Sequence, residues 1–291
     1  QAMQMLSTGE CDLLDSSYGL ENLTKSALED LAQTANLHIE FLESFEQLVF
    51  GIIPAAYDDG YSVWAGDRPD YFGDLRVRQA VAACLQPAAL ANAVLSEKLP
   101  AELLPQWQDW TAGLDAEALL DQAGWIDADG DPTTPRVAQG INGVFDMTPL
   151  SLSLLTSQAE LDQQIGTWIV TRLGDCGIEV HWQSLPTAEL YAPGPEGVLF
   201  GRQFDLALLS WHTAGQDPCR MYLSKVVPSA DNAWIGTNLA GWADPAFDLA
   251  CGENQMRLDP PESQDAWELL KATLPAIPLL PHPVVWASSL D

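Results

Sequence analysis

Three acidic residues are spaced like the first ligands of a calcium-binding loop. Asp127, Asp129 and Asp131 stand at alternate positions, and an EF-hand loop continues with glycine at its sixth position and glutamate at its twelfth. Here those positions hold Pro132 and Ala138. Proline fixes its own backbone φ and cannot make the sharp turn that glycine allows. We therefore expect a solvated turn and no metal ion.

Nucleophilic and nucleotide chemistry also find little support. The chain has no GxSxG elbow, no GxxxxGK[ST] loop and no dinucleotide fingerprint. His38 and His181 fall within expected strands, where we expect them to pack, and His282 lies between prolines. His212 differs because it stands at the end of an expected strand, where it could contact a ligand. No catalytic constellation is evident, so we expect neither an enzyme nor a cofactor.

Acidic residues dominate the charge of the chain. Its 291 residues include 41 Asp and Glu against 12 Lys and Arg, a net charge of −29. A polyanion such as nucleic acid would be repelled, and an anionic membrane surface is disfavoured for the same reason. Glycosidase chemistry needs two carboxylates at a specific separation, which abundance alone does not indicate. A carboxylate-based hydrolase therefore stays as a minor alternative.

The first half of the sequence predicts several helices around a loop-rich region. Residues 26–36 should form a helix, with Ser26 and Glu29 as a capping box. Residues 38–53 predict two strands, and the Gly-, Pro- and Asp-rich residues 54–73 a loop. Helices are expected at 74–85 and 115–123. No run of 18 apolar residues occurs, so we expect no helix across a membrane.

The second half predicts an α/β unit. Strands are expected at 150–155, 178–182 and 204–211, with a helix between the first two capped by Ser157 and Glu160. Residues 204–211 are almost continuously apolar, as in a sheet covered on both faces. Ligands of such sheets sit beyond the carboxyl ends of the strands. Those ends are Thr156–Ser157 and Trp211–Pro218. Helices near 245–256 and 261–273 and a strand pair within 277–286 should follow.

Several blocks, taken in order, resemble one known family. They are AMQMLSTGECDLLD (2–15), FGDLRVRQAVAACL (72–85), ALLDQAGWIDADGD (118–131), LSLSLLTS (150–157), GIEVHW (177–182), FDLALLSWHTAGQDP (204–218), GTNLAGWADPAFDLA (236–250) and LPAIPLLPHPVVW (274–286). Each block is weak alone, and FGDLRVRQAVAACL is the most specific. The ordered set resembles the extracellular solute-binding proteins of family 5, the oligopeptide, dipeptide and nickel group that serves ABC importers.

The resemblance implies a two-lobed, type II periplasmic-binding-protein fold with a mixed sheet flanked by helices. Family members are longer, and the chain resembles their C-terminal portion. Residues 1–70 would then belong to the first lobe and hinge, 71–264 to the second, ligand-binding lobe, and 265–291 would return to the first lobe. The implied function is capture of a peptide or similar solute outside the cell and delivery to permease subunits. A monomer is expected, anchored in the full-length protein by an N-terminal lipid.

The carboxyl end of the expected strand 204–211 predicts a ligand wall, because ligands of α/β sheets bind beyond such ends. Trp211, His212, Thr213 and Gln216 should face the cleft, the first through an aromatic surface and the others through hydrogen bonds. Peptide-binding relatives carry an acidic residue in this block that holds the ligand's α-amino group, and the matching position here is Ala214. An unpaired ammonium would be costly to bury, so an oligosaccharide stacking on Trp faces is the alternative ligand.

The five cysteines complete what the resemblance implies. An odd number leaves at least one free thiol, and the absence of CxxC disfavours a zinc site. An extracellular protein favours disulfides. We expect Cys219 with Cys251, both in the second lobe, and as a weaker second pair Cys84 with Cys176, which would leave Cys11 free.

Overall fold

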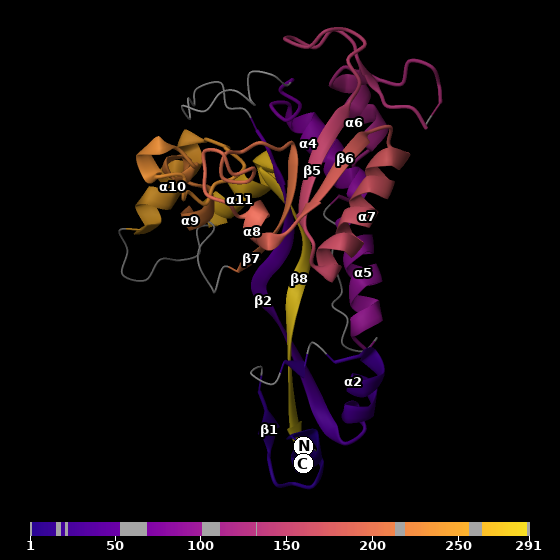
Figure 1. Ribbon diagram of the computed structural model, residues 1–291, viewed down its shortest axis with the longest axis vertical. Helices are drawn as coiled ribbons and strands as arrows, with labels where there is room; N and C mark the ends of the chain where they lie inside the picture. Colours follow the sequence, from indigo (N-terminus) through magenta and orange to yellow (C-terminus); the bar gives the residue numbers. More distant parts are fainter. Residues whose placement is uncertain are drawn as a thin grey trace.

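A computed structural model describes residues 2–15, 19–20, 23–52, 69–100, 111–131, 133–212, 219–255 and 264–289. Two long antiparallel strands, β2 (Ala35–Phe50) and β8 (Ala276–Ser289), join a larger part of the molecule to a smaller one (Figure 1). Both chain termini lie at the end of the smaller part. Each of the two strands thus passes from one part into the other.

The smaller part holds two helices that contact its portion of the sheet. Its elements are α1 (Ala2–Ser7), β1 (Leu13–Leu14) and α2 (Lys25–Ala32). Helix α2 begins after Thr24, whose hydroxyl accepts a hydrogen bond from the amide of Ala27. The capping box expected at Ser26 is therefore wrong, because the cap lies two residues earlier. Leu28 and Leu31 of α2 are buried.

The larger part holds most of the helices and the parallel strands. Its helices are α4 (Leu75–Leu85), α5 (Pro87–Lys98), α6 (Ala116–Gln122), α7 (Glu160–Asp175), α8 (Thr187–Leu190), α9 (Cys219–Tyr222), α10 (Pro245–Gln255) and α11 (Gln264–Thr273), with 3₁₀ turns η4 (Ser224–Val226) and η5 (Ala230–Asn232). Figure 1 shows α4–α7 on one side of the sheet and α9–α11 on the other.

One mixed sheet runs through both parts in the order β1-β8-β2-β7-β5-β6. Strands β5 (Ser151–Ser157), β6 (Glu179–Leu185) and β7 (Leu206–His212) are parallel to one another, and β2 is antiparallel to β7. The small hairpin β3 (Trp125–Ile126) and β4 (Val137–Ala138) stands apart. The predicted strand–helix–strand unit, with a further strand in the same sheet, is confirmed.

The helix between β5 and β6 does not begin as predicted. Ser157 is the last residue of β5, and α7 starts at Glu160 after Ala159, without a side-chain cap. The hydroxyl of Ser157 instead donates to the carboxylate of Asp162. One apolar face of α7 packs inward, with Ile165, Ile169 and Leu173 completely buried.

Each of the two long strands was predicted as a pair of strands, and both predictions are wrong. Residues 38–53 look divided because His38–Glu40 alternate whereas Leu48–Phe50 are continuously apolar. The first segment belongs to the smaller part, and the second is buried in the larger sheet between β7 and β8. The pairing of β2 with β8 shifts register between Phe41 and Phe45 and between Glu46 and Gln47. These shifts let one continuous strand pair in both the smaller and the larger part.

One stretch, Leu75–Lys98, is long and apolar enough to cross a membrane by length and composition alone. It consists of two helices, α4 and α5, separated by Gln86 with a backbone φ of 50°. The buried residues of α4 include Val77, Ala80, Val81 and Cys84. A disulfide joins Cys84 to Cys176 at the end of α7. The stretch therefore forms part of the core of the larger part.

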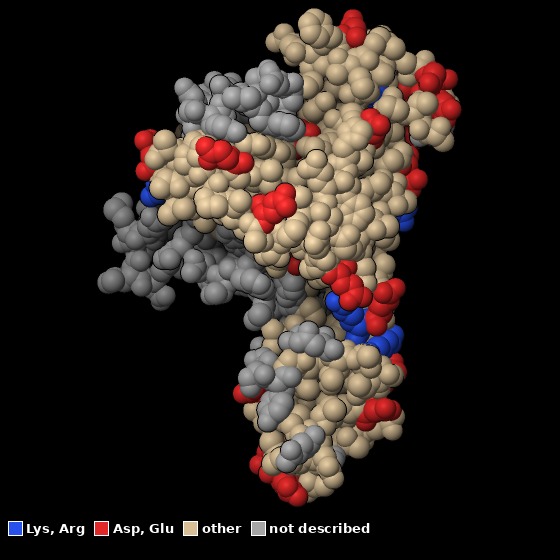
Figure 2. All heavy atoms as spheres, viewed as in Figure 1, with Lys and Arg blue, Asp and Glu red and all other residues tan. Residues whose placement is uncertain are grey.

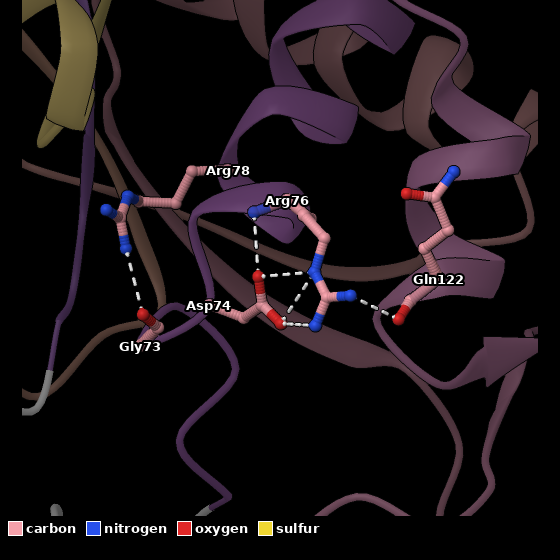
Figure 3. A network of polar contacts seen from close by, with 5 residues as sticks. All are labelled: Gly73, Asp74, Arg76, Arg78 and Gln122. Atoms are coloured by element: carbon pink, nitrogen blue, oxygen red, sulfur yellow. Dashed lines mark hydrogen bonds and ion pairs between the residues drawn. The ribbon is translucent and has the colours of Figure 1, made fainter.

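Hydrogen bonds from the most specific block of the sequence join three helix ends, and Figure 3 shows those at the start of α4 and the end of α6. Asp74 caps α4 by accepting from the amide of Arg76 at 2.8 Å, and it also binds the Arg76 guanidinium. Arg76 in turn donates to the carbonyl oxygen of Gln122, the last residue of α6. Buried Arg78 donates to carbonyl oxygens of Phe72, Gly73 and Thr273. These hydrogen bonds therefore connect the start of α4 with the ends of α6 and α11.

Candidate functional site

The carboxyl ends of the three parallel strands lie at one edge of the sheet. Ser157 of β5 is in register with Leu185 of β6, and β7 ends at His212 beside the same edge. Figure 1 shows this edge of the larger part turned toward the smaller part, next to the point where β2 and β8 cross between them. Ligands of α/β sheets bind beyond such ends. We take this edge, called the carboxyl edge below, as the candidate site.

A serine and an aspartate form the buried floor of the carboxyl edge. Ser157 is 8% exposed and Asp162, in the first turn of α7, is 9% exposed. The Ser157 hydroxyl donates to Asp162 and accepts from the amide of Ala159 at 3.0 Å. This pair therefore places a carboxylate beside a hydroxyl at the end of β5.

Neighbouring polar side chains hold the strand ends in place. The Gln163 amide donates to the Ser184 hydroxyl at 2.6 Å and to the carbonyl of Ser157 at 2.9 Å. Trp182 donates from Nε1 to the hydroxyl of Thr156 at 2.9 Å. Helix α7 approaches Trp182 so closely that a Cβ on Gly166 would lie 2.5 Å from the indole ring. The floor is thus rigidly supported by β6 and α7.

Tyr191 and Glu46 extend this acidic character. Tyr191 follows α8, is 42% exposed, and has its phenol pKa raised by burial and then by the negative charges of Asp162 and Glu46. Glu46 is 2% exposed on β2, opposite Ser210 of β7. Both carboxylates therefore contribute to the negative electrostatic environment of this phenol.

The predicted wall residues lie partly beyond what the structure describes. Trp211 and His212 end β7, opposite Phe45 and Ser44 of β2, so their backbone stands at the carboxyl edge as expected. Their side chains are not described. Thr213, Gln216 and Ala214 lie outside the described residues. A ligand contact by Trp211, His212, Thr213 or Gln216 therefore stays a prediction.

Sequence reasoning missed Asp162, Tyr191 and Glu46 as members of the site. Acidic residues are so numerous in this chain that no single one stands out. The available signal was position: Asp162 lies in the first helical turn after a predicted strand end. Glu46 could not be assigned because residues 38–53 were divided into two strands, which hid its pairing with β7.

Two other predicted features have structural roles. In the acidic turn, Asp129 accepts hydrogen bonds from the amide of Asp131 at 2.9 Å and the hydroxyl of Thr134 at 3.0 Å. These bonds hold the pKa of Asp129 below its usual value. His181 was expected to pack and is instead exposed, with Nε2 3.5 Å from Glu179. The reason is that β6 is the edge strand of the sheet.

The cysteines form two disulfides. Cys219 at the start of α9 is bonded to Cys251 on α10, the pair expected from the sequence, with an S–S distance of 2.09 Å. Cys84 is bonded to Cys176, and Cys11 is a free thiol. Within the described ranges, no three His, Cys, Asp or Glu side chains are grouped so that they could hold a metal ion.

Comparison with solved structures identifies the fold. The chain is similar to an oligopeptide-binding protein from Thermus thermophilus in complex with a pentapeptide, with a TM-score of 0.66, 18% identity, and coverage of 99% of this chain and 50% of that one. It is also similar to the oligopeptide-binding protein AppA from Bacillus subtilis in complex with a nonapeptide. There the TM-score is 0.63 and the identity 15%, and the match covers 99% of this chain and 53% of that one. A third similar structure is NikA from Brucella suis in complex with Fe(III)-EDTA. Its TM-score is 0.61 and its identity 19%, and the match covers 99% of this chain and 55% of that one.

These neighbours are substrate-binding proteins, and the mixed sheet flanked by helices is the type II fold they share with this chain. The chain spans about half the length of each of these three structures. No curated protein matches it. The model of the bacterial extracellular solute-binding proteins, family 5 Middle, matches residues 1–232. That match covers most of the sequence, and the chain therefore belongs to family 5 of the bacterial extracellular solute-binding proteins.

Proposed function

We propose that the chain captures a peptide or similar medium-sized solute for an ABC importer and binds it at the carboxyl edge. One observation carries the proposal. The ends of β5, β6 and β7 face the smaller part of the molecule across the crossing of β2 and β8 (Figure 1). A site between two bodies joined by two strands can close on its ligand by hinge motion.

The lobe boundaries follow from this proposal. Residues 1–70 contribute to the first lobe and the hinge, 71–264 form the ligand-binding lobe, and 265–291 return to the first lobe. Within the first segment, β2 carries the chain from the smaller part into the larger sheet. The proposed ligand wall consists of Trp211, His212, Thr213 and Gln216.

The acidic groups of the carboxyl edge favour ligands with donor groups. Asp162 and Glu46 are both nearly buried and both raise the phenol pKa of Tyr191. Ala214 stands where peptide-binding relatives carry an acidic residue. In this proposal Asp162 and Glu46 supply the negative charge near the ligand instead. A peptide presents many N–H donors along its backbone, which matches a wall rich in acceptors.

The proposed action takes place outside the cell, and membership of a family of extracellular binding proteins supports this location. The full-length protein is proposed to be a monomer, held at the membrane by an N-terminal lipid, that delivers its solute to permease subunits. Two disulfides fit an oxidising location. The net charge of −29 would keep such a protein from adhering to anionic surfaces.

The test is a thermal-shift screen of the purified chain against defined libraries of oligopeptides and of oligosaccharides. A ligand that binds only the folded state raises the melting temperature with concentration. The proposal expects dose-dependent shifts with peptides, and intact peptides after incubation by mass spectrometry. Shifts with oligosaccharides alone would assign the alternative ligand class. Cleavage of either class would make the chain a hydrolase, and no shift with any compound would remove the proposal.

A further inference from the structure

A lysine of the smaller part contacts a helix end of the larger part. Lys25, the first residue of α2, donates from Nζ to the carbonyl oxygen of Ser96 in the last turn of α5 at 2.9 Å. The contact is partly buried and joins residues 71 positions apart. Figure 2 shows Lys and Arg side chains gathered at the junction between the two parts. This bond therefore spans the junction directly.

The sequence explains why this carbonyl needs a donor from elsewhere. In an α-helix the carbonyl of Ser96 would accept from the amide four residues on, and that residue is Pro100, which has no N–H. The helix also ends at Lys98, so its last carbonyls carry partial negative charge. An ammonium group is suited to such a position. Lys25 supplies it from the other side of the junction.

The Lys25–Ser96 contact lies on the side of the hinge opposite the carboxyl edge. Figure 1 shows α2 and α5 on one side of β2 and β8, and α8, α9 and the end of β7 on the other. If the two parts close over the carboxyl edge by rotating about these strands, they must separate on the opposite side. The Lys25–Ser96 contact would then be lengthened or broken. It therefore belongs to the open arrangement.

We infer that Lys25 is a positioning residue that sets ligand affinity from outside the site, by stabilising the open arrangement through its bond to Ser96. The inference rests on the proposed function, because it requires two lobes that close. A bond present in one state alone shifts the equilibrium toward that state by its own free energy. Loss of the bond would raise the closed-to-open ratio about fivefold, since a typical hydrogen bond contributes about 1 kcal/mol.

The ratio can be measured without any ligand. Cys11, the free thiol near β1, carries one spin label, and an Ala246→Cys substitution on the exposed start of α10 carries the other. Cys11 precedes β1 and Ala246 belongs to α10, and Figure 1 shows β1 and α10 on the side of β2 and β8 that holds the end of β7. Closure would shorten the distance between them. Double electron–electron resonance gives the distance distribution for the chain with Lys25 and for its variants.

The variants separate the bond from the charge. Lys25→Met removes the donor but keeps the aliphatic stem, and we expect the short-distance population to rise about fivefold. Lys25→Arg can donate to the same carbonyl and should restore the original distribution. Lys98→Ala removes a neighbouring positive charge at the same helix end and should leave it unchanged. An unaltered distribution in Lys25→Met, or an equal shift in Lys98→Ala, would overturn the inference.

Because no ligand is used, this result is independent of the screen for solutes. A shift in Lys25→Met with no peptide binding would leave the hinge role intact while the proposed ligand class fails. Peptide binding with an unaltered distance distribution would do the reverse. Circular dichroism melting of each variant checks that the folded state is retained before the distances are compared.

Discussion

Arg78 binds the carbonyl oxygen of Thr273 through two nitrogen atoms, Nε at 3.0 Å and Nη2 at 2.7 Å. The two residues are 195 positions apart. Arg78 belongs to α4, whereas Thr273 ends α11 immediately before β8 begins. The guanidinium thus fixes the point from which β8 leaves for the smaller part. Burial lowers the pKa of Arg78 to about 10, so it stays charged at neutral pH.

Replacing Arg78 with Met should therefore be strongly destabilising. The side chain is 6% exposed, and its loss would leave the buried carbonyl oxygen of Phe72 and the partly buried carbonyl oxygen of Thr273 without this donor. Unsatisfied buried acceptors cost about 1–3 kcal/mol each, so we expect a loss of about 2–4 kcal/mol in the free energy of unfolding. Urea denaturation at pH 7 measures it. Arg172→Met, at a half-exposed site, is the control and should cost far less.

Asp74 should contribute to the acid sensitivity of the fold. The hydrogen bond from the Arg76 side chain holds the pKa of Asp74 below its usual 3.8. A carboxyl group with a lowered folded-state pKa stabilises the fold above its unfolded pKa, and this contribution is lost as the pH falls through the folded pKa. Asp74→Asn keeps a capping oxygen but has no charge.

The Asp74→Asn variant should therefore be less stable than the parent at pH 7, and the difference should shrink below about pH 3.8. Urea midpoints between pH 2 and pH 7 provide the measurement, with Asp115→Asn at the cap of the neighbouring helix α6 as a comparison. A difference that is constant across this range would mean that the Asp74–Arg76 pair contributes nothing through charge.

Both disulfides should stabilise the chain. They close loops of 92 and 32 residues, which in the chain-entropy model corresponds to about 4–5 and about 3–4 kcal/mol. We expect double substitution by serine of Cys84 and Cys176, or of Cys219 and Cys251, to lower the unfolding midpoint markedly. Cys11→Ser should not. Thiol titration of the denatured, unreduced chain should find one reactive group, and three or more would contradict the pairing.

The sequence was most informative where local pattern and tertiary environment agree. The apolar run of 204–211 and the periodic face of α7 predicted β7, α7 and their burial, because each lies in one uniform environment. It failed for β2 and β8, which pass through two environments. In β8, Pro278, Pro281 and Pro283 suggested a break, yet the strand continues by shifting its register against β2.

The site was predictable in place but not in composition. Strand ends at Thr156–Ser157 and Trp211 follow from the pattern, because parallel strands present their carboxyl ends together. The contact of Ser157 with Asp162 and the effect of Glu46 on Tyr191 depend on how α7, α8 and β2 pack. Such contacts join residues from separate elements, and no spacing in the sequence encodes them.

Trp211 provides a test of the proposed wall. Trp211→Ala should weaken binding of the best peptide from the screen by about 1–3 kcal/mol, the usual loss for a well-packed aromatic contact. Trp168→Ala is the matched control, because Trp168 packs under Arg172 and donates to the carbonyl of Leu85, away from the carboxyl edge. It should lower stability but not affinity. Calorimetric titration measures both, and equal affinities for Trp211→Ala and the parent would remove Trp211 from the site.

Ala214 provides a complementary gain of function. An Ala214→Asp substitution would restore a carboxylate at the position where peptide-binding relatives carry one. If Ala214 faces the cleft, the variant should bind peptides with a free α-amino group more tightly than their N-acetylated forms, by a larger factor than the parent does. Titration of the paired peptides provides the comparison, and Ala214→Asn controls for size. The same ratio in both variants would place Ala214 away from the ligand.

The central claim is that a solute binds at the carboxyl edge of the larger part. Hydrogen–deuterium exchange of the chain, with and without the best peptide from the screen, tests it most directly. The account predicts slower exchange in the segments that carry Ser157–Gln163, Ser184–Tyr191 and the end of β7, with the turn around Asp129 unchanged. Protection confined to α10 or to the Asp129 turn, with the carboxyl edge exchanging as before, would contradict it.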